Sequence, residues 1–377
     1  MIKTIEIRNF KAIEKVKVKL SPLTAFIGYN GTGKSSLLEG LEMFKALVTE
    51  GLDRAIRPWK EFEHIYYKGK KKSQKFTKGG IEHQFSPIEF LFSAYLSQKN
   101  GNKRLSFSTA IGQEKTDRRN MFFISEKVNH GLFERVRDAD NHYIKEDRSM
   151  SEQSPDKSIL SSELEISRYV ESWQFLSMNT FLMGDAFPQK KTNGIITLNK
   201  DGRNIAEYLL SIREKDVNAY QGIIETLSYV LPYAKDLQPQ ITTELERMVY
   251  LQMTEQDFKL PGWMLSTGTL KILAILAVFR NPEPSPLIVI EELENGLDPR
   301  AIHLVITEIQ HYLDQQKGQV LITSHSPYLL DLLHISHIIF VARKNDAVCM
   351  SRPADNQEVM EWSKKYAPGQ LYTQKGF

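Results

Sequence analysis

The chain has 377 residues, of which 41% are hydrophobic and 25% are charged, a composition typical of a soluble globular protein and not of a disordered or fibrous one. Its net charge of +3 at pH 7 neither indicates nor excludes a nucleic-acid partner. The single cysteine, Cys349, excludes an internal disulfide, and the longest apolar run, 272–279, is far shorter than the roughly 20 residues that span a bilayer. We therefore expect a cytoplasmic protein with no membrane partner.

The N-terminal segment predicts two antiparallel strands, 2–7 and 14–20, and in the second of them apolar residues alternate with charged ones. An apolar run, 23–27, then predicts a buried strand, and 35–47 has the apolar spacing of a helix. Between them, 28-GYNGTGKSS-36 satisfies the phosphate-loop pattern G-x-x-x-x-G-K-[ST]. The stretch therefore has the order of strand, loop and helix that this pattern requires.

This phosphate loop (P-loop) indicates a nucleotide site. A Gly-rich turn that opens a helix points consecutive backbone N–H groups at one spot, where the helix dipole also favours an anion. Lys34 is expected to reach the β- and γ-phosphates of ATP, and Ser35 to ligate Mg²⁺. The alternative, a Gly-rich turn without a ligand, fits the flanking strand and helix less well. The residues expected to bind the nucleotide here are Asn30, Gly31, Thr32, Gly33, Lys34, Ser35 and Ser36.

The middle of the chain predicts three strands, 88–96, 104–111 and 120–128. They lie too close in sequence for helical crossovers, so an antiparallel meander is favoured. Two predicted helices and a further strand follow, at 204–212, 218–231 and 246–253.

The last third of the chain alternates strands with helices. A small Gly-containing loop opens an apolar helix within 265–279, and an apolar strand, 287–290, precedes a second helix, 300–316. A further buried strand, 319–323, ends in 324-SHSP-327. This alternation predicts an open parallel sheet with its chemistry at the carboxyl ends of the strands.

Charged and titratable side chains follow both of these strands. A catalytic ATPase needs one carboxylate to hold Mg²⁺ and another to orient and deprotonate the attacking water. We assign Glu291 to the metal, directly or through water, and Glu292 to the general base. His325 is placed to sense the γ-phosphate and the attacking water, although taken alone it would equally fit a packed core histidine.

Three segments carry a resemblance to a known family. Leu265–Thr269 resembles the signature loop of ABC-type ATPases, Glu294–Asp298 resembles their D-loop, and His325 resembles their switch histidine. Together with the N-terminal stretch 7–39, these segments resemble the SMC/RecF-like branch. The greatest similarity is to compact AAA_21-type predicted ATPases grouped with the OLD and PtuA-type anti-phage proteins. Two further stretches resemble that compact group: 198–210 and 361–371.

The resemblance implies an α/β fold, namely a P-loop ABC ATPase head. Its mostly parallel core sheet is expected to be flanked by helices and to carry an antiparallel β-subdomain and a mixed α+β insertion. Three segments are expected. Residues 1–80 form an N-terminal ATPase lobe with the P-loop, and 81–255 form the β-meander and a helical insertion. Residues 256–377 form a C-terminal lobe with the signature, Walker B strand, D-loop and switch histidine.

The resemblance also implies a head-to-head homodimer, or a larger assembly, that buries two ATP molecules. Ser266 and the Gly268 backbone would cap the γ-phosphate held by the partner's P-loop, with the dipole of the following helix as the physical reason. Asp298 would make a contact across the same dimer. Lys11 lies where relatives place a basic residue near the phosphates or DNA, and an exposed turn lysine is the equal alternative.

Two features bear on nucleic acid. Lysines crowd the stretch Lys68–Lys78 beside aromatic residues, so it is either a DNA-binding patch that contacts the phosphate backbone or a solvated charged loop. Only residues 326–377 follow His325, without a D-x-D pair, so we do not expect the Toprim nuclease domain that OLD proteins carry.

Gln84 is a candidate for the Q-loop glutamine, with a surface glutamine as the alternative.

The sequence thus predicts an ATP-binding and ATP-hydrolysing head that forms an ATP-sandwiched dimer. It is expected to control an effector protein encoded nearby, or DNA, in bacterial anti-phage defence. Two other classes stay open. DNA-stimulated turnover would favour a RecF-like ATPase of DNA repair or maintenance. Tight ATP binding without turnover would favour a non-catalytic, nucleotide-gated scaffold that sequesters a toxin.

Overall fold

The structure is a computed structural model of the chain. It describes residues 1–69, 76–78, 81–83, 86–98, 101–114, 121–129, 134–137, 142–144, 150–152, 154, 156–190, 195–234, 236–243, 247–255, 258–344 and 347–374. The chain forms two units, each built from two stretches of sequence. The first unit contains Met1–Trp173 and Ser336–Asn356, and the second contains Gln174–Ile335 and Gln357–Phe377.

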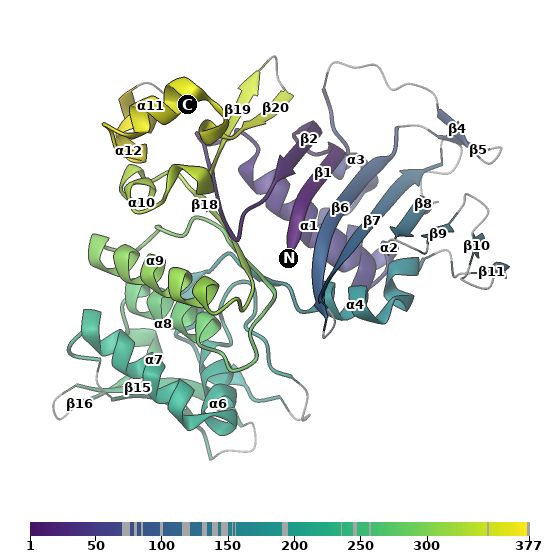
Figure 1. The fold of residues 1–377 in the computed structure, drawn as a ribbon. Helices are drawn as coiled ribbons and strands as arrows, with labels where there is room; N and C mark the ends of the chain where they lie inside the picture. The colour runs from purple at the N-terminus through teal and green to yellow at the C-terminus, as the bar shows by residue number, and fades with distance from the viewer. Residues whose placement is uncertain are drawn as a thin grey trace. The chain divides into compact units, whose positions relative to one another are not determined.

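An antiparallel sheet dominates the first unit, in the strand order β11-β10-β9-β8-β7-β6-β1-β2 (Figure 1). Alternating residues explain β2, because Val16 and Val18 are buried while Lys15 and Lys17 are exposed. The meander predicted for the middle strands is confirmed, since β7 pairs antiparallel with both β6 and β8. The strands are β1 (Ile2–Phe10), β2 (Ile13–Lys19), β6 (Ile88–Gln98), β7 (Gly101–Gln113), β8 (Met121–Asn129), β9 (Glu134–Arg137), β10 (His142–Ile144) and β11 (Met150–Glu152).

Helix α1 (Lys34–Thr49) packs on this sheet through aromatic rings. The ring of Phe44 lies 4.4 Å from that of Phe92 and 5.6 Å from that of Phe107, centroid to centroid. Gly40 allows the helix to approach β1, because a Cβ at this position would lie 2.8 Å from the Cδ1 atom of Ile7. Burial of large apolar side chains stabilises by about 25 cal/mol per Å². The packing therefore anchors the helix whose first turn follows the P-loop.

The strand before α1 is β3 (Leu23–Ile27), which is buried at every position. It pairs in parallel with β19 (Ile338–Lys344), and β20 (Ala347–Ser351) pairs antiparallel with β19. Segments from opposite ends of the chain therefore lie side by side in the first unit. This pairing brings β19 and β20 against the loop that follows β3.

Three parallel strands form a sheet in the second unit. β12 (Gln174–Leu176) pairs with β17 (Leu287–Ile290), which pairs with β18 (Gln319–Ser324). Strands buried on both faces are apolar throughout, which explains why the residues of β17 do not alternate. Because the strands are parallel, the residues after β17 and after β18 meet at one edge of this sheet.

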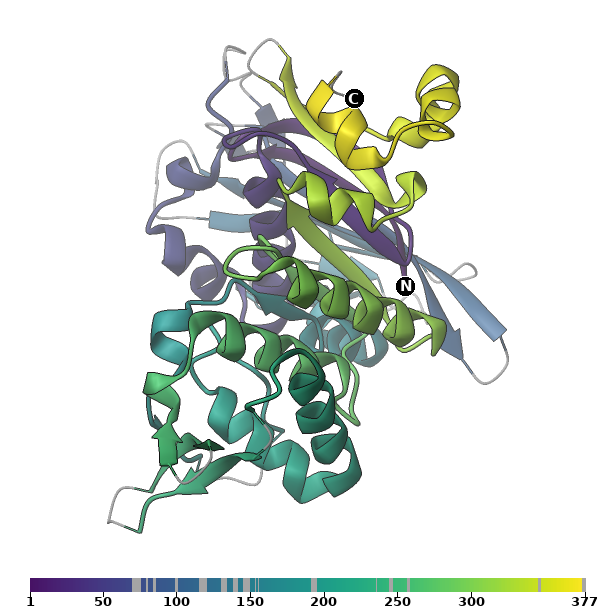
Figure 2. The same cartoon turned by 90° about the vertical axis from the view of Figure 1, so that its left-hand side faces the viewer.

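Two long helices follow the signature segment and β17. α8 (Thr267–Phe279) is apolar on all sides and buried from Thr269 onward, whereas α9 (Pro299–Asp314) is amphipathic. They lie side by side and are drawn in green in Figure 2. The other helices of both units are α2 (Leu52–Ile56), α3 (Phe62–Ile65), α4 (Leu164–Glu171), α5 (Thr180–Met183), α6 (Ile205–Lys215), α7 (Val217–Val230), α10 (Pro327–Asp331), α11 (Gln357–Ser363) and α12 (Pro368–Gln374).

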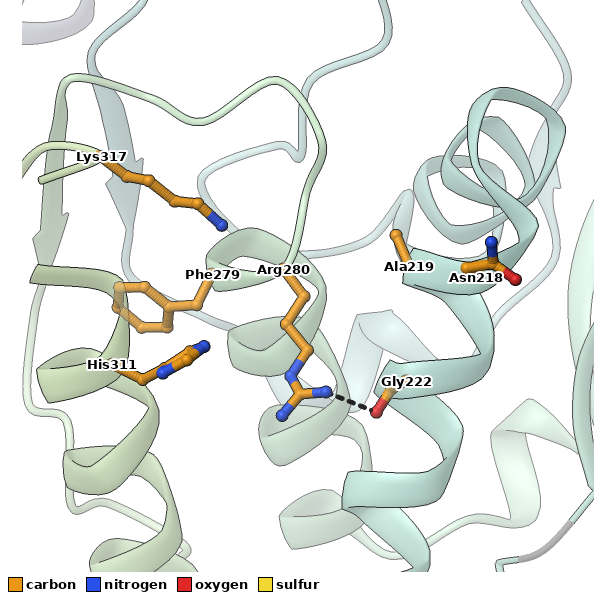
Figure 3. A pocket seen from close by; sticks show the side chains of 7 residues that line it. All are labelled: Asn218, Ala219, Gly222, Phe279, Arg280, His311 and Lys317. Atoms are coloured by element: carbon orange, nitrogen blue, oxygen red, sulfur yellow. Dashed lines mark hydrogen bonds between the residues drawn. The ribbon is translucent and has the colours of Figure 1, made fainter. Parts of the chain in front are cut away.

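Arg280 ties the C-terminal end of α8 to its neighbours (Figure 3). Its Nε and Nη2 atoms donate to the carboxylate of Glu308 on α9 at 2.8 Å, and its Nη1 atom donates to the carbonyl oxygen of Gly222 on α7 at 2.8 Å. Residues of these three helices, among them Ala219 of α7 and Phe279 of α8, line a pocket of about 230 Å³. The pairing of Arg280 thus fixes α8 between α7 and α9.

A small antiparallel sheet completes the second unit, in the order β13-β15-β14 with β16 beside β15. Its strands are β13 (Phe187–Pro188), β14 (Asp236–Ile241), β15 (Met248–Glu255) and β16 (Phe258–Pro261). Two short strands of the first unit, β4 (Phe76–Lys78) and β5 (Ile81–His83), also pair antiparallel. The α/β class predicted from the sequence is confirmed, and the predicted boundaries at residues 80 and 255 stay a prediction. Within the described ranges, no helix is both long enough and apolar enough for a bilayer span.

Candidate functional site

The P-loop takes its shape from glycines. Gly31 and Gly33 have φ angles of 76° and 105°, in the left-handed region that other residues rarely adopt. A Cβ at Gly28 would lie 2.1 Å from the carbonyl oxygen of Val341, and a Cβ at Gly33 would lie 2.5 Å from the Cγ2 atom of Val348. Glycine is therefore favoured in the turn between β3 and α1, at Gly31 and Gly33 by their φ angles and at Gly28 and Gly33 by the close approach of β19 and β20.

The side chain of Lys34 is hydrogen-bonded to the backbone of its own loop. It is 8% exposed, and its Nζ atom donates to the carbonyl oxygens of Gly28 at 2.6 Å and Tyr29 at 3.0 Å. Thr32 is also buried, and its hydroxyl donates to the Tyr29 carbonyl at 2.8 Å. No side chain caps the start of α1, where Gly33 is the N-cap. An uncapped N-terminus behind a Gly-rich turn fits an anion.

The other predicted P-loop residues differ in exposure. Asn30, Gly31 and Ser35 are exposed, whereas Ser36 is buried in the first turn of α1. The role of Ser35 as a metal ligand stays a prediction. Lys11 lies in the same unit, with its Nζ atom 2.5 Å from the carboxylate of Glu39 on α1.

The predicted carboxylates directly follow β17 in the second unit, and both are half-buried. The backbone N–H of Glu291 donates to the carbonyl oxygen of Leu176 at 2.8 Å, which continues the pairing with β12. Glu292 leaves the strand with a φ of 47°, and its N–H donates to Thr323 Oγ1 at 2.9 Å. The side chain of Asn295 donates to Glu292 Oε2. Both the backbone and the carboxylate of Glu292 are therefore held in place.

Lys271 of α8 supports the same turn. Its side chain is buried, and its Nζ atom donates to the carbonyl oxygens of Glu292 at 2.9 Å and Asn295 at 2.8 Å. Burial lowers the pKa of Lys271 to about 8, although the nearby carboxylates of Glu294 and Glu292 oppose this shift. A lysine inside an otherwise apolar helix was the sequence signal for this residue, which the motifs alone did not identify.

Glu294 orients His325. The carboxylate of Glu294 is 8% exposed, and its Oε1 atom accepts from the backbone N–H of His325 at 2.8 Å and lies 3.2 Å from the ring Nδ1 atom. The imidazole of His325 is 46% exposed, so it is not a core histidine. Glu294 Oε2 is buried without a hydrogen-bond partner among the described residues. In the sequence, Glu294 stands out only as the first residue of the D-loop pattern.

The signature and D-loop residues have local roles at helix starts. Ser266 is the N-cap of α8, and its hydroxyl accepts from the N–H of Thr269 at 3.1 Å. Asp298 is the N-cap of α9, and its Oδ1 atom accepts from the N–H of Arg300 at 2.8 Å. A Cβ at Gly268 would lie 3.0 Å from the carbonyl oxygen of Gly296. The signature segment thus packs directly on the D-loop.

The predicted residues fall into two sets, one in each unit. The first unit holds Lys11 and the P-loop, and the second brings together Ser266, Gly268, Glu291, Glu292, Asp298 and His325. In the parts of the chain that are described, no group of three or more His, Cys, Asp or Glu side chains could hold a metal ion. Magnesium in phosphoryl-transfer sites uses one or two protein carboxylates together with phosphates and water, and Ser35 and Glu291 stay predicted ligands of this ion.

Two predictions fall largely outside the described residues. In the basic stretch, Lys70, Lys71, Lys72 and Lys75 lie outside the described ranges, and so does Gln84. The side chain of Lys68 is exposed. The DNA-binding patch and the Q-loop glutamine therefore stay predictions.

Comparison with curated proteins connects the chain to a larger enzyme. It is 23% identical over 363 residues to the OLD nuclease of Thermus scotoductus, and the match covers 92% of this chain and 63% of that protein. The chain thus spans less than two thirds of the length of this relative.

Comparison with solved structures concerns the fold. One SMC head, bound to the C-winged helix domain of ScpA, has a TM-score of 0.56 at 14% identity and covers 93% of this chain and 97% of its own. A second structure is an Smc head domain with an extended coiled coil bound to the C-terminal domain of ScpA derived from Pyrococcus furiosus. It has a TM-score of 0.50 at 13% identity, and the match covers 97% of this chain and 99% of that one. These similarities confirm the predicted P-loop ATPase head fold.

A family model matches residues 23–331, which include the P-loop, the signature segment, the carboxylates and His325. Its description is "AAA domain, putative AbiEii toxin, Type IV TA system". The resemblance predicted from the motifs is therefore confirmed. The chain belongs to this family, AAA_21, of AAA-type ATPase domains.

Proposed function

We propose that this protein binds ATP at the P-loop and hydrolyses it to ADP and phosphate. The observation that carries the proposal is the structure of the P-loop. Its turn is shaped by glycines, its lysine, Lys34, donates to the carbonyl oxygens of Gly28 and Tyr29, and no side chain caps the helix that follows. Membership in a family of AAA-type ATPase domains supports it. The backbone N–H groups at the start of α1 bind the phosphates, and Lys34 exchanges its carbonyl partners for phosphate oxygens.

Glu292 acts as the general base. Its Oε2 atom accepts a hydrogen bond from Asn295, which leaves Oε1 to accept the proton of the attacking water. As the water oxygen bonds to the γ-phosphorus, the bond to the bridging oxygen breaks and its electron pair leaves with ADP. His325, oriented by Glu294, donates to the γ-phosphate. Ser35 and Glu291 would hold Mg²⁺, which neutralises phosphate charge when bound.

The proposed active assembly is a homodimer. Ser266 and the Gly268 backbone lie at the start of α8, where the helix dipole favours an anion, and they would cap the γ-phosphate bound to the partner's P-loop. Asp298 would contribute from the adjoining D-loop. The exposure of Ser266 supports this role, because a capping group has to be accessible to a second copy.

The ATP cycle is proposed to control an effector protein or DNA in anti-phage defence. The support is the family description, which names a toxin and a Type IV toxin–antitoxin system, and the relation to an OLD nuclease. Stimulation of turnover by DNA would favour a DNA-maintenance ATPase instead. Tight ATP binding without turnover would favour a nucleotide-gated scaffold.

The decisive experiment compares Glu292→Gln with Glu283→Gln, an exposed glutamate paired with Lys215. Loss of a general base lowers turnover by roughly 100-fold or more, while ATP affinity should stay within a factor of about three. Glu283→Gln should behave as wild type. If Glu292→Gln hydrolyses ATP as fast as wild type, the base assignment is wrong.

The dimer is tested in the same background. In ATP, Glu292→Gln should run as a dimer in size-exclusion chromatography with light scattering, because the closed state is no longer released by hydrolysis. Adding Ser266→Arg should return it to a monomer, since arginine is too large for the capping position. A wild-type monomer that turns over ATP by itself would contradict the proposal.

A further inference from the structure

We propose that Lys271 is a positioning residue for ATP hydrolysis, whose ammonium group holds the backbone turn that carries Glu292 and so places its carboxylate. The inference rests on the proposed function, because it assigns a residue that acts through the general base. It adds a side chain on α8 that lies outside the P-loop, signature, Walker B, D-loop and switch segments.

The placement of Lys271 is unusual for a lysine. It is the only charged residue of α8, and it is 5% exposed among apolar neighbours. A buried ammonium group is unfavourable unless it is hydrogen-bonded. Its ammonium group donates to two backbone carbonyl oxygens of one turn, those of Glu292 and Asn295. The hydrogen bonds of this buried cation therefore both hold this turn.

The turn needs such support. Glu292 has a φ of 47°, a conformation that is strained for a residue with a side chain. Thr323 binds its N–H, and Lys271 binds its carbonyl oxygen, so the peptide groups on both sides of the Cα atom are fixed. Without Lys271 the carbonyl would be released, and the residue could relax towards an unstrained φ. Such a rotation would swing the carboxylate away from its position.

Lys271 also connects this turn to the signature segment. It lies on the second turn of α8, whose N-cap is Ser266, and Gly268 packs on the D-loop at Gly296. Displacement of the start of α8 would therefore be transmitted to the carbonyl oxygens that Lys271 holds. The charged groups that act on the ammonium are the carboxylates of Glu292 and Glu294, and both favour its charged form.

The test compares Lys271→Met and Lys271→Arg with wild type. Lys271→Met removes the donor with little change in length, and a misplaced catalytic group lowers kcat on the order of 10- to 100-fold, with KM for ATP within about twofold. Lys45→Met is the matched control, because Lys45 is also desolvated and donates to a backbone carbonyl, that of Trp173 at 2.6 Å. The control should lose stability without losing kcat.

The pH profile separates positioning from general stability. Burial lowers the pKa of Lys271 to about 8, so wild-type kcat should fall as the ammonium loses its proton above that pH. Lys271→Arg stays protonated and should keep its activity to higher pH. If Lys271→Met does not fold, the pH profiles of kcat for wild type and Lys271→Arg still test the inference.

The double variant gives the second readout. In a Glu292→Gln background, Lys271→Met should lower turnover by less than twofold, because the group that it positions is already absent. If Glu292→Gln lowers turnover but Lys271→Met and Lys271→Arg leave kcat and the pH profile unchanged, the inference fails and the proposed function stands. If Glu292→Gln has no effect, the proposed function itself fails.

Discussion

The P-loop and the turn after β17 are both proposed to act on ATP, but they are built differently. In the P-loop, the left-handed conformations fall on glycines, Gly31 and Gly33, and the loop-closing hydrogen bonds of Lys34 span at most six residues of sequence. The turn conformations and these hydrogen bonds are thus encoded by the loop's own short segment, while β19 and β20 restrict Gly28 and Gly33 from outside it.

In the turn after β17, the left-handed conformation falls on a glutamate. Glu292 is held there by Thr323, 31 residues away, and by Lys271, 21 residues away. The proposed general base is therefore fixed by distant contacts, whereas the loop proposed to bind the phosphates takes its left-handed conformations from its own glycines. A sequence motif thus locates the turn after β17 but does not reveal which residues hold the backbone of Glu292.

The largest effect is expected from the local region. Gly33→Ala places a Cβ 2.5 Å from Val348 Cγ2 at a φ of 105°, and such strain and overlap together destabilise on the order of 3–5 kcal/mol. We expect a matching loss of ATP binding, measured by calorimetry, and a lower midpoint of thermal unfolding. Gly31→Ala is the control, because it has nothing within 4 Å and should lose only about 1–2 kcal/mol.

A double variant sharpens this test. Gly33→Ala combined with Val348→Ala removes the overlapping atoms and should recover part of the stability, but not the part due to the φ angle. Equal stability of Gly31→Ala and Gly33→Ala would show that the contact with β20 does not shape the loop.

A smaller effect is expected from a distant contact of the turn. Thr323→Val keeps the shape of the side chain but leaves the N–H of Glu292 without its acceptor, which destabilises by about 1–3 kcal/mol. Turnover should fall about tenfold as Glu292 shifts, while ATP affinity stays unchanged. Thr307→Val, on the exposed side of α9, should alter neither quantity. Unchanged turnover in Thr323→Val would mean that the turn holds its conformation without tertiary help.

The buried cation gives the turn a pH dependence. Burial lowers the pKa of Lys271 from 10.5 to about 8, so between these values the unfolded chain binds more protons than the folded one. The Lys271 contribution to the free energy of unfolding is therefore constant below pH 8 and rises with pH above it. From pH 7 to pH 10, wild type should gain on the order of 1–3 kcal/mol relative to Lys271→Met in urea unfolding. If the difference in free energy of unfolding between wild type and Lys271→Met is the same at all pH values, the pKa of Lys271 is not lowered by burial.

The smallest effect is expected at Lys11. Its ammonium is paired with Glu39 at a half-exposed position, and such pairs contribute about 0–1 kcal/mol. If the pair is the whole role of Lys11, Lys11→Met and Glu39→Gln should lower stability equally and leave ATP and DNA affinity unchanged. A loss of affinity in Lys11→Met alone would instead support the predicted contact with phosphate or DNA.

Prediction from sequence succeeded where the signal was local or periodic. The P-loop strand 23–27, the β17 strand 287–290 and the antiparallel meander agree with the structure. The strand β14 was not predicted, because Pro239 lies in its middle and proline usually argues against a strand. The strand β12 was missed because its three residues, Gln174–Leu176, are too few to show a period.

The candidate site divides in the same way. Glu291, Glu292 and His325 were predicted as site residues because carboxylates and a histidine after apolar strands are typical of ATPase chemistry, and their roles stay predictions. The supporting contacts of Lys271 and Thr323 could not be predicted, since neither belongs to a motif and each depends on which elements pack together.

What the sequence by itself determined is the nucleotide-binding loop and the family, because glycines, one lysine and one serine at set spacing carry both the conformation and the chemistry. Only the tertiary structure decided how Glu292 is held, since its conformation is unfavourable locally and persists through partners on α8 and β18. Local conformational preference encodes a loop, whereas the conformation of the proposed catalytic carboxylate requires hydrogen bonds that the fold brings from elsewhere in the chain.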